Sequence, residues 1–378
     1  MTRSQLSKCL YSLYKVRKLI EKKREIMEYT IDDLLIYAKN RKASDLHVTA
    51  GIQAKCRVDG ILEQITKEPL TAGDTEELIR PMMNDKLMKT FIENGEVDFS
   101  YQIKDVGRFR VNVFRQRGAF ATVLRLVNSV IPLPDSLGVP PSVVELTKRK
   151  RGLVLVTGPT GSGKSTTLAS LIDVINRTRE EHIITLEDPI EYLHNHKRSI
   201  VNQREIGFDT MNYANGVRAA LREDPDVILV GEMRDLDTIS TAITAAETGH
   251  LVFSTLHTIG AAPTIDRVID VFPPHQQDQI RVQLASVLLA VVSQSLIPLA
   301  SGHGRVAAFE IMHANPAIRN LIRENKTHQI ESIMQTSRNI GMQTMDDCIF
   351  KLYMDGKIDS EQALEFAQKP EVLGKKLF

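Results

Sequence analysis

The sequence predicts an α/β protein of two domains, the second built on a mainly parallel sheet with helices on both faces. The first observation is that short apolar runs alternate with helical patterns from about residue 151 onward, which is the element order of a parallel sheet. The second is a glycine-rich loop that lies between one of these runs and a helix. The third is length, because 378 residues leave room for two domains.

Composition excludes several classes of protein. The hydrophobic fraction of 42% and the charged fraction of 25% are ordinary for a globular chain, and they exclude collagen-like, low-complexity and wholly disordered proteins. The net charge of +1 gives no sign of a nucleic-acid partner. The three cysteines, Cys9, Cys56 and Cys348, lie far apart and form neither a disulfide framework nor a zinc motif, so we expect a reducing cytosol.

Residues 1–26 form a basic extension. Eight Lys or Arg residues against two Glu give it a net charge of +6, which leaves −5 for the rest of the chain. Its leucine spacing suits an arm that binds anionic lipid or nucleic acid. The plainer interpretation, which we favour, is a solvated appendage upstream of a start at Met27. The extension lacks the continuous apolar core of a secretory signal.

The first domain is expected over residues 27–130. A helix begins near Thr30, which is a suitable N-cap because two aspartates follow it in the first turn. Alternating segments predict strands at 45–49, 55–60 and 107–115. In the last of these, arginines alternate with apolar residues, the pattern of a half-buried strand.

A linker is expected over residues 131–145, the stretch richest in turn-forming residues, and the second domain over residues 146–378. Apolar runs predict strands of the second domain at 153–157, 182–186, 227–230 and 251–255. The weakly charged stretch 282–300 is too polar and too interrupted to span a bilayer, and we expect a buried helix that runs into a loop. From about residue 315 the pattern is helical.

The strongest motif is the loop Gly158–Ser165, which fits G-x-x-x-x-G-K-[ST] and has the required strand before it and helix after it. Its glycines let backbone N–H groups converge on phosphates at a helix N-terminus. Lys164 is expected to reach the β- and γ-phosphates, and Ser165 to bind Mg²⁺. The residues expected to bind ATP are Gly158, Thr160, Gly161, Ser162, Gly163, Lys164, Ser165 and Thr166.

Acids follow two of the predicted strands, at the sheet edge where the phosphate loop lies. Glu187 ends one strand and Glu232 follows another. An ordinary Walker B strand carries an Asp where this chain has Gly231, so the metal is expected to rely on Ser165, phosphates and water. We assign Glu232 to orient and polarise the attacking water and Glu187 to support the metal or that water. The alternative for each acid is a helix cap or a surface ion pair.

A third strand ends in His257, which is expected to sense the γ-phosphate or to hold Glu232 in place. A structural role is the alternative for this histidine. No cluster of Cys, His or acidic residues has metal-ligand spacing, and the remaining nearby histidines are interpreted as surface residues: His182, His194 and His196.

Arginines gather in the last strands of the first domain. Arg108 and Arg110 are expected on one strand face, opposite Phe109 and Val111. Phosphoryl transfer often gains from an arginine supplied in cis or in trans. If these two supply it, the catalytic site lies between domains or subunits; a solvated polar face is the alternative.

Together these motifs resemble one family, the type IV pilus retraction ATPases (the PilT family) of the secretion-ATPase superfamily, from about Met27 to the end. The segments that carry the resemblance are Ala43–His47 (N-terminal signature), Gly158–Thr166 (Walker A), Thr185–Glu191 (aspartate box), Asp226–Glu232 (atypical Walker B), Ser254–Thr258 (histidine box) and Ala317–Glu324 (a signature of retraction). The last is also an amphipathic helix capped by Asn315, with a buried stripe expected at Ala317, Ile318, Leu321 and Ile322. The resemblance implies that Arg319, Arg323 and Glu324 face something functional.

The resemblance implies a PAS-like α/β N-terminal domain and a RecA-like P-loop ATPase domain with a helical C-terminal portion, assembled as a homo-hexamer. It implies a Mg²⁺-dependent ATPase that acts on an inner-membrane platform protein and depolymerises a pilus in twitching motility. The expected location is the cytoplasm, at the inner face of the cytoplasmic membrane, with membrane association only through that partner and no direct nucleic-acid contact.

Absences and departures qualify the resemblance. Extension and type II secretion motors usually carry a long extra N-terminal domain, and many a tetracysteine insert; this chain shows neither pattern. The basic extension is not part of the family pattern, and Arg125-Leu-Val replaces the more usual Arg-Thr-Ile. The alternatives are an accessory retraction ATPase of the same family, a DNA-translocating RecA-like ATPase and a nucleotide-binding module without hydrolysis. The charge of −5 outside the extension disfavours DNA.

Overall fold

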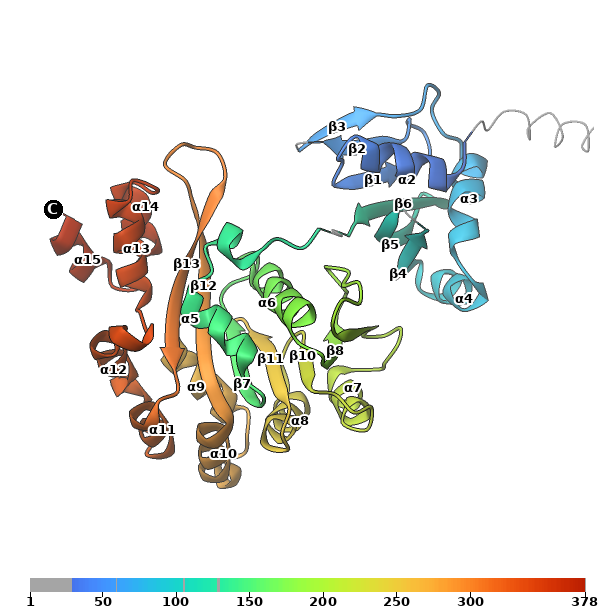
Figure 1. The fold of residues 1–378 in the computed structure, drawn as a ribbon. Coiled ribbons are helices and arrows are strands. Elements are labelled where there is room, and N and C mark those ends of the chain that lie inside the picture. The colour runs from blue at the N-terminus through green and yellow to red at the C-terminus, as the bar shows by residue number, and fades with distance from the viewer. Residues whose placement is uncertain (1–28, 59, 105, 128–129, 378) are drawn as a thin grey trace, which may run out of the picture. The chain divides into compact units, whose positions relative to one another are not determined.

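The computed structural model describes residues 29–58, 60–104, 106–127 and 130–377. The basic extension predicted at residues 1–26 lies outside these residues. Contacts divide the chain into two compact units, residues 1–128 and 129–378, each described here by itself (Figure 1). No helix among the described residues is long and apolar enough to cross a lipid bilayer.

The first unit is an antiparallel sheet with helices. Its strand order is β3-β2-β1-β6-β5-β4. The strands are β1 (Asp45–Val48), β2 (Lys55–Val58), β3 (Ile61–Gln64), β4 (Glu96–Ile103), β5 (Gly107–Gln116) and β6 (Ala119–Leu126), and the helices are α2 (Ile31–Asn40), α3 (Ala72–Ile79), η1 (Arg80–Met82) and α4 (Asp85–Asn94). The expected helix at Thr30 is confirmed, with Thr30 and Asp33 forming a capping box.

The second unit contains a seven-stranded sheet of order β13-β12-β7-β11-β10-β8-β9. All its neighbours are parallel except β12 and β13. The strands are β7 (Gly152–Thr157), β8 (His182–Glu187), β9 (Ile200–Glu205), β10 (Val227–Val230), β11 (Leu251–Leu256), β12 (Leu288–Pro298) and β13 (Arg305–His313). The four strands predicted for this domain are confirmed, and β9, β12 and β13 add to them.

The expectation for 282–300 was wrong beyond Val287. Helix α10 (Pro274–Val287) ends early in this stretch, and β12 takes up most of the rest. Residues Ala290 to Val292 are buried, because β12 lies inside the sheet between β7 and β13. A strand covered on both faces shows no polar alternation, so its pattern is not distinguishable from that of a buried helix.

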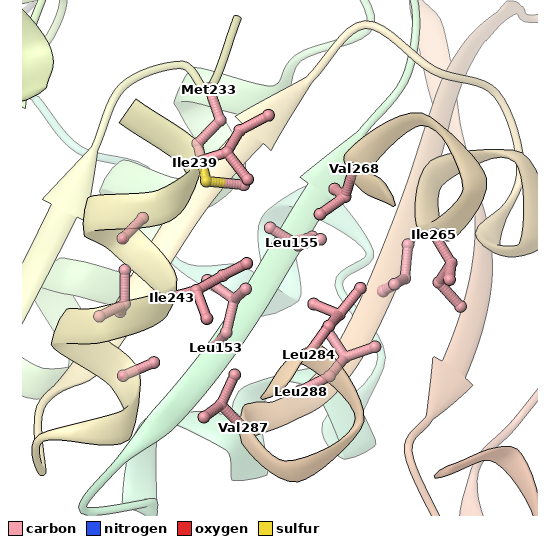
Figure 2. Close-up of a cluster of buried hydrophobic side chains, with 14 of the residues drawn as sticks. Leu153, Leu155, Met233, Ile239, Ile243, Ile265, Val268, Leu284, Val287 and Leu288 are labelled. Atoms are coloured by element: carbon pink, nitrogen blue, oxygen red, sulfur yellow. The ribbon is translucent and has the colours of Figure 1, made fainter. Parts of the chain in front are cut away.

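Helices cover both faces of this sheet, as the sequence predicts. Alternate residues of β7 point to opposite faces. Leu153 and Leu155 pack in one core with α8 (Leu236–Glu247), α9 (Ala261–Asp270) and α10, and Val154 and Val156 pack in another with α6 (Lys164–Thr178). Figure 2 shows Leu153 and Leu155 between α8 on one side and α9 and α10 on the other. The helices are α5 (Pro141–Val144), α6 (Lys164–Thr178), α7 (Tyr213–Ala220), α8 (Leu236–Glu247), α9 (Ala261–Asp270), α10, α11 (Pro316–Arg323), α12 (Ile330–Thr336), α13 (Met345–Met354), α14 (Ser360–Phe366) and α15 (Pro370–Leu377), with short 3-10 turns η2 (Pro134–Leu137), η3 (Glu145–Lys148), η4 (Thr327–Gln329) and η5 (Arg338–Ile340).

The turn-rich segment 131–145 packs within the second unit. Val139 and Val143 are buried in the core that also holds residues of α6. The segment therefore contributes apolar surface to this core in addition to connecting the chain.

Glu310, on β13, is a buried carboxylate that joins three elements. It is 5% exposed. One oxygen accepts the N–H of Ala261 at the start of α9, at 2.7 Å. The other accepts the N–H of Met345 at the start of α13, at 3.4 Å, and the side chain of Gln368, at 3.1 Å. Burial raises the pKa of Glu310.

Candidate nucleotide-hydrolysis site

The phosphate loop connects β7 to α6 and requires glycine at two places. A Cβ on Gly158 would lie 2.2 Å from the carbonyl oxygen of Gln294, and one on Gly163 2.9 Å from the side-chain nitrogen of the same residue. Both glycines also have positive φ angles, 139° and 89°. Gln294 belongs to β12, is 3% exposed and accepts a hydrogen bond from Thr167 at 2.8 Å. The strand that the sequence did not reveal therefore supports the loop.

The loop presents free backbone donors. Among the described residues, the N–H groups of Gly161, Gly163, Lys164 and Ser165 have no hydrogen-bond acceptor. Three of them surround the N-terminus of α6, which carries a partial positive charge. This combination is a phosphate-binding site built from backbone.

Lys164 is held inside the loop. It is 8% exposed, and its Nζ donates to the carbonyl oxygens of Gly158, at 2.9 Å, and Pro159, at 3.0 Å. Burial lowers its pKa, whereas nearby Glu232 and Glu191 act in the opposite direction. Phosphate oxygens are stronger acceptors than these carbonyls, because they are charged.

Strand order explains how the catalytic candidates meet. The phosphate loop follows β7, His257 follows β11 and Glu232 follows β10, and these three strands are neighbours in that order. His257 therefore stands between the loop and the acid. Its Nε2 lies 3.1 Å from Oε1 of Glu232, and its Nδ1 lies 3.3 Å from the hydroxyl of Thr160.

Glu232 has a second partner that the sequence analysis missed. The Nε of Arg234 lies 2.6 Å from the same carboxylate oxygen that faces His257. Glu232 is largely buried and Arg234 is largely exposed. A pattern of acid and base two residues apart in an extended segment is the only sequence signal for this pair.

Glu187 ends β8, next to β10. Its carboxylate accepts hydrogen bonds from the hydroxyl of Thr185, at 2.6 Å, and the side chain of Gln203, at 3.0 Å. Burial raises its pKa. Because these partners already occupy one carboxylate oxygen, Glu187 is restrained in position. Gln203 comes from β9, which was not expected.

One cavity of ≈ 190 Å³ brings the predicted groups together. Its lining includes Thr160, Gly161, Lys164, Ser165, Glu187, Glu232 and His257. A second cavity of ≈ 330 Å³ adjoins the loop through Gly163 and Thr166, and Arg305 and Lys357 also line it. A larger cavity of ≈ 740 Å³ lies beside α11, but no predicted nucleotide-binding or catalytic residue lines it. The cavities at the loop therefore define the candidate site.

Other predicted binding residues have different environments. The side chain of Ser162 is buried, and the hydroxyl of Thr166 lies 3.0 Å from that of Tyr192. Gly161 lies in open space, with a φ of 80°.

Arg108 and Arg110 belong to β5 of the first unit. As expected, they alternate with Phe109 and Val111, which are buried, and Arg110 is exposed. Arg125, on the neighbouring β6, forms an ion pair with Asp45 at 2.8 Å. The role of Arg108 and Arg110 as catalytic arginines stays a prediction.

His194 is not the surface residue expected. It lines the 190 Å³ cavity, and its Nδ1 is buried without a hydrogen-bond partner among the described residues. Burial lowers its pKa to about 4. Tyr213 also lines this cavity and was missed, because its place on α7 gives no signal in the sequence.

The retraction signature lies on α11, with Asn315 as N-cap. Ile318 and Ile322 are buried as expected, but Ala317 is exposed. Arg319 donates to backbone carbonyls of Ala314 and Leu288, at 2.9 and 2.8 Å, and to those of Ala285 and Ser286. Arg319 thus ties α11 to the end of α10. Arg323 and Glu324 are exposed.

Comparisons with known proteins identify the relatives of this chain. The family described as type II/IV secretion system protein matches residues 20–365. The type IV pilus retraction ATPase PilT of Pseudomonas aeruginosa is 51% identical over 341 residues, which cover 90% of this chain and 99% of the relative. The type IV pilus ATPase PilU of the same organism is 39% identical, over 89% of this chain and 88% of the relative.

A solved structure matches as well. The crystal structure of the pilus retraction motor PilT with bound ADP has a TM-score of 0.86 and 52% identity, over 92% of this chain and all of that one. Agreement in sequence and in fold extends over both units. The chain therefore belongs to the type II/IV secretion system protein family and, within it, to the pilus retraction ATPases of the PilT family.

Proposed function

We propose that this protein is an ATP-hydrolysing motor that powers type IV pilus retraction. The observation that carries the proposal is the contact between Glu232, His257 and Thr160, because it places a carboxylate and a histidine at the phosphate loop. The names of the PilT relatives, one of them a retraction motor with bound ADP, support the coupling to a pilus.

The two cavities at the loop suit the two ends of ATP. The phosphates lie on the free N–H groups of the loop, and Lys164 leaves its carbonyl partners for phosphate oxygens. The 330 Å³ cavity takes the ribose and the base, since it adjoins the loop on the side of Thr166. The Arg305 and Lys357 side chains at its edge add positive charge.

The residues present fit Mg²⁺ held by Ser165, phosphate and water. A carboxylate at position 231 has no room, because a Cβ there would lie 2.9 Å from the carbonyl of Leu186 and from the hydroxyl of Tyr213. Among the described residues no group of three Cys, His or acidic side chains forms a metal site by itself. When bound, the metal neutralises the charge that develops on the phosphates.

Glu232 orients and polarises the water that attacks the γ-phosphate, and His257 holds its carboxylate in place. Glu187, restrained by Thr185 and Gln203, supports that water or the metal through the shared cavity. A positioned base of this kind contributes about 10²–10⁴-fold to the rate.

The working assembly is a homo-hexamer on an inner-membrane platform protein, at the cytoplasmic face of the membrane. The family relationship supports this assembly. In it, Arg108 and Arg110 of the first unit supply positive charge to the transition state in cis or in trans.

The variant Glu232→Gln tests the proposal. Hydrolysis is expected to fall by about 10²–10³-fold because the water loses its base, while ATP binding is kept. The matched control is Glu223→Gln, an acid that pairs with Arg204 and does not line the cavity. In cells lacking the wild-type protein, Glu232→Gln leaves surface pili to accumulate. Wild-type hydrolysis by Glu232→Gln would refute the assignment.

An accessory retraction ATPase of the same family is the second candidate. The two differ in autonomy. A primary motor hydrolyses ATP as purified protein and retracts pili in a strain without other retraction motors, whereas an accessory ATPase needs its partner motor.

A further inference from the structure

Arg234 occupies a special place beside the reacting groups. Its Nε lies 2.6 Å from Oε1 of Glu232, and Glu232 is its only ion-pair partner among the described residues. Its side chain is 74% exposed, against 15% for that of Glu232. Arg234 is therefore free to turn about its side-chain bonds, whereas the carboxylate is confined.

The backbone around Arg234 is fixed from both sides. The N–H of Met233 donates to the carbonyl of Thr255 at 3.1 Å, and the Met233 side chain is 3% exposed. Figure 2 shows Met233 in the core beside Ile239 of α8. Asp235 then caps α8 by accepting the N–H of Thr238 at 2.8 Å. With Met233 anchored inside, the side chains before and after it meet in the ion pair between Glu232, which lines the cavity, and Arg234.

One carboxylate oxygen of Glu232 has two hydrogen-bond donors beside it. Arg234 and His257 both donate to Oε1. Lys164 lies close enough for the charge of Glu232 to affect its pKa. A γ-phosphate held by Lys164 therefore arrives next to Glu232 and next to the guanidinium that neutralises it. Phosphate and carboxylate then compete for one guanidinium, and the more highly charged phosphate wins.

We propose that Arg234 exchanges partners when a triphosphate binds: it holds Glu232 in the empty site and moves to the γ-phosphate, which frees the carboxylate to take the attacking water. This inference deepens the proposed hydrolysis and rests on it. Lys164 exchanges partners in the same way, because its ammonium group is held by backbone carbonyl oxygens until phosphate oxygens replace them. Both cations then respond to the presence of phosphate, and Arg234 responds to the third phosphate in particular.

Binding measurements on four proteins test this exchange: wild type, Arg234→Gln, Glu232→Gln and the double variant. The dissociation constants of ADP and of the non-hydrolysable analogue AMPPNP are measured for each full-length chain with Mg²⁺. Arg234→Gln is expected to weaken AMPPNP by about tenfold and to leave ADP within about twofold, because only the triphosphate gains the guanidinium. Arg234→Lys keeps part of the preference.

The Glu232→Gln background separates exchange from simple positioning. With the carboxylate gone, Arg234 is no longer held, so AMPPNP binds more tightly than in the wild type and Arg234→Gln costs more affinity than it does in the wild-type background. If Arg234 only positioned Glu232, Arg234→Gln would lower kcat and leave nucleotide binding unchanged in both backgrounds. The proposal is overturned if the ratio of the AMPPNP and ADP dissociation constants is the same in all four proteins.

Two controls keep the outcomes distinct. Arg218→Gln removes an exposed arginine of α7 that bonds only to Asn215 among the described residues, and it keeps the wild-type ratio. Thermal unfolding of Arg234→Gln is expected within about 2 °C of wild type, because the side chain is exposed. If Glu232→Gln hydrolyses ATP normally, the proposed function fails; if it blocks hydrolysis and Arg234→Gln leaves the ratio unchanged, only the exchange fails.

Discussion

Gly231 shows at the scale of one residue why this site departs from the ordinary Walker B pattern. An aspartate usually stands at this position, but a Cβ here would lie 2.9 Å from the carbonyl oxygen of Leu186 and from the hydroxyl of Tyr213. The N–H of Gly231 donates to the same carbonyl at 2.8 Å, so the backbone cannot withdraw without losing that bond. This packing leaves no space for an acid at position 231, and Glu232 next to it is the carboxylate at this strand end.

We therefore predict that Gly231→Ala destabilises the protein by about 1–3 kcal/mol through overpacking, and that Gly231→Asp costs more. Removing the hydroxyl in Gly231→Ala/Tyr213→Phe restores part of the loss, because one of the two close contacts disappears. Thermal unfolding of the three variants checks this. Tyr213→Phe alone is the reference, and Gly231→Ala with wild-type stability would contradict the close packing.

His194 predicts a pH dependence of stability. Its pKa is about 4 in the folded protein, lowered by burial, against about 6.5 in an unfolded chain. Between these values the unfolded state binds more protons. The contribution of His194 is therefore complete above pH 6.5 and is lost as the pH falls toward 4, at no more than about 1.4 kcal/mol per pH unit.

The variant His194→Gln tests the direction of this pH dependence. Its free energy of unfolding is expected to fall less steeply than that of wild type between pH 6.5 and 4.5. His275→Gln, at an exposed site on α10, serves as the control and keeps the wild-type slope. Parallel curves for wild type and His194→Gln would contradict the burial argument.

At the scale of elements, Arg319 joins the end of α10 to α11. Its guanidinium donates hydrogen bonds to backbone carbonyls at the end of α10 that have no partner within the helix. One of them is the carbonyl of Leu288, at 2.8 Å. The retraction signature therefore contains at least one residue whose contacts are internal. Arg323, one turn further along α11, is exposed and has only a 3.5 Å contact with Asn320 among the described residues.

These two arginines form a matched pair for mutagenesis. Arg319→Gln is expected to destabilise the protein by about 2 kcal/mol, because partly buried carbonyls lose their donor. Arg323→Gln is expected to change stability by less than about 0.5 kcal/mol. Urea unfolding measures both. Similar losses of stability for the two variants would show that the hydrogen bonds from Arg319 to the end of α10 do not stabilise the protein.

The same scale shows what sequence can and cannot predict. The four predicted strands of the parallel sheet were clear because each is a short apolar run next to a turn or a helix pattern. In contrast, β12 begins with an apolar run that resembles a buried helix and continues with Ser293, Gln294 and Ser295, which resemble a loop. Their polarity serves the phosphate loop and α9: Gln294 supports the loop and Ser293 accepts the N–H of Gly260 at 3.0 Å.

The site was predictable in part for a related reason. Glu187, Glu232 and His257 each follow a predicted strand, so parallel topology alone places them at one edge. Arg234 and Gln203 carried no such marker, because their roles depend on how a loop or an edge strand returns to that edge. Sequence reasoning therefore found the groups at strand ends and missed their partners.

At the scale of the whole molecule, the two units have separate cores. Within the described part of the chain, one cluster of buried side chains lies entirely in the first unit, and three lie in the second. Both cavities at the phosphate loop are lined only by residues of the second unit. The cores of the second unit and the linings of both cavities are therefore supplied by its own residues.

We predict that a fragment of residues 129–378 unfolds cooperatively and binds ADP, because its cores and its phosphate loop are complete. Its hydrolysis is expected to be much weaker than that of the full chain, since it lacks Arg108 and Arg110. Circular dichroism and ADP titration check folding and binding. If the fragment hydrolyses ATP at the full rate, Arg108 and Arg110 of the first unit have no role in catalysis.

Glu310 gives the second unit a mechanical joint. One oxygen of its carboxylate holds the start of α9, three residues after the loop position of Thr258, and the other holds α13 and Gln368. The start of α9 is therefore linked to the start of α13 through this one carboxylate. Two oxygen atoms of a single side chain thus join the segment after β11 to the carboxy-terminal helices, so a shift of either one strains the other.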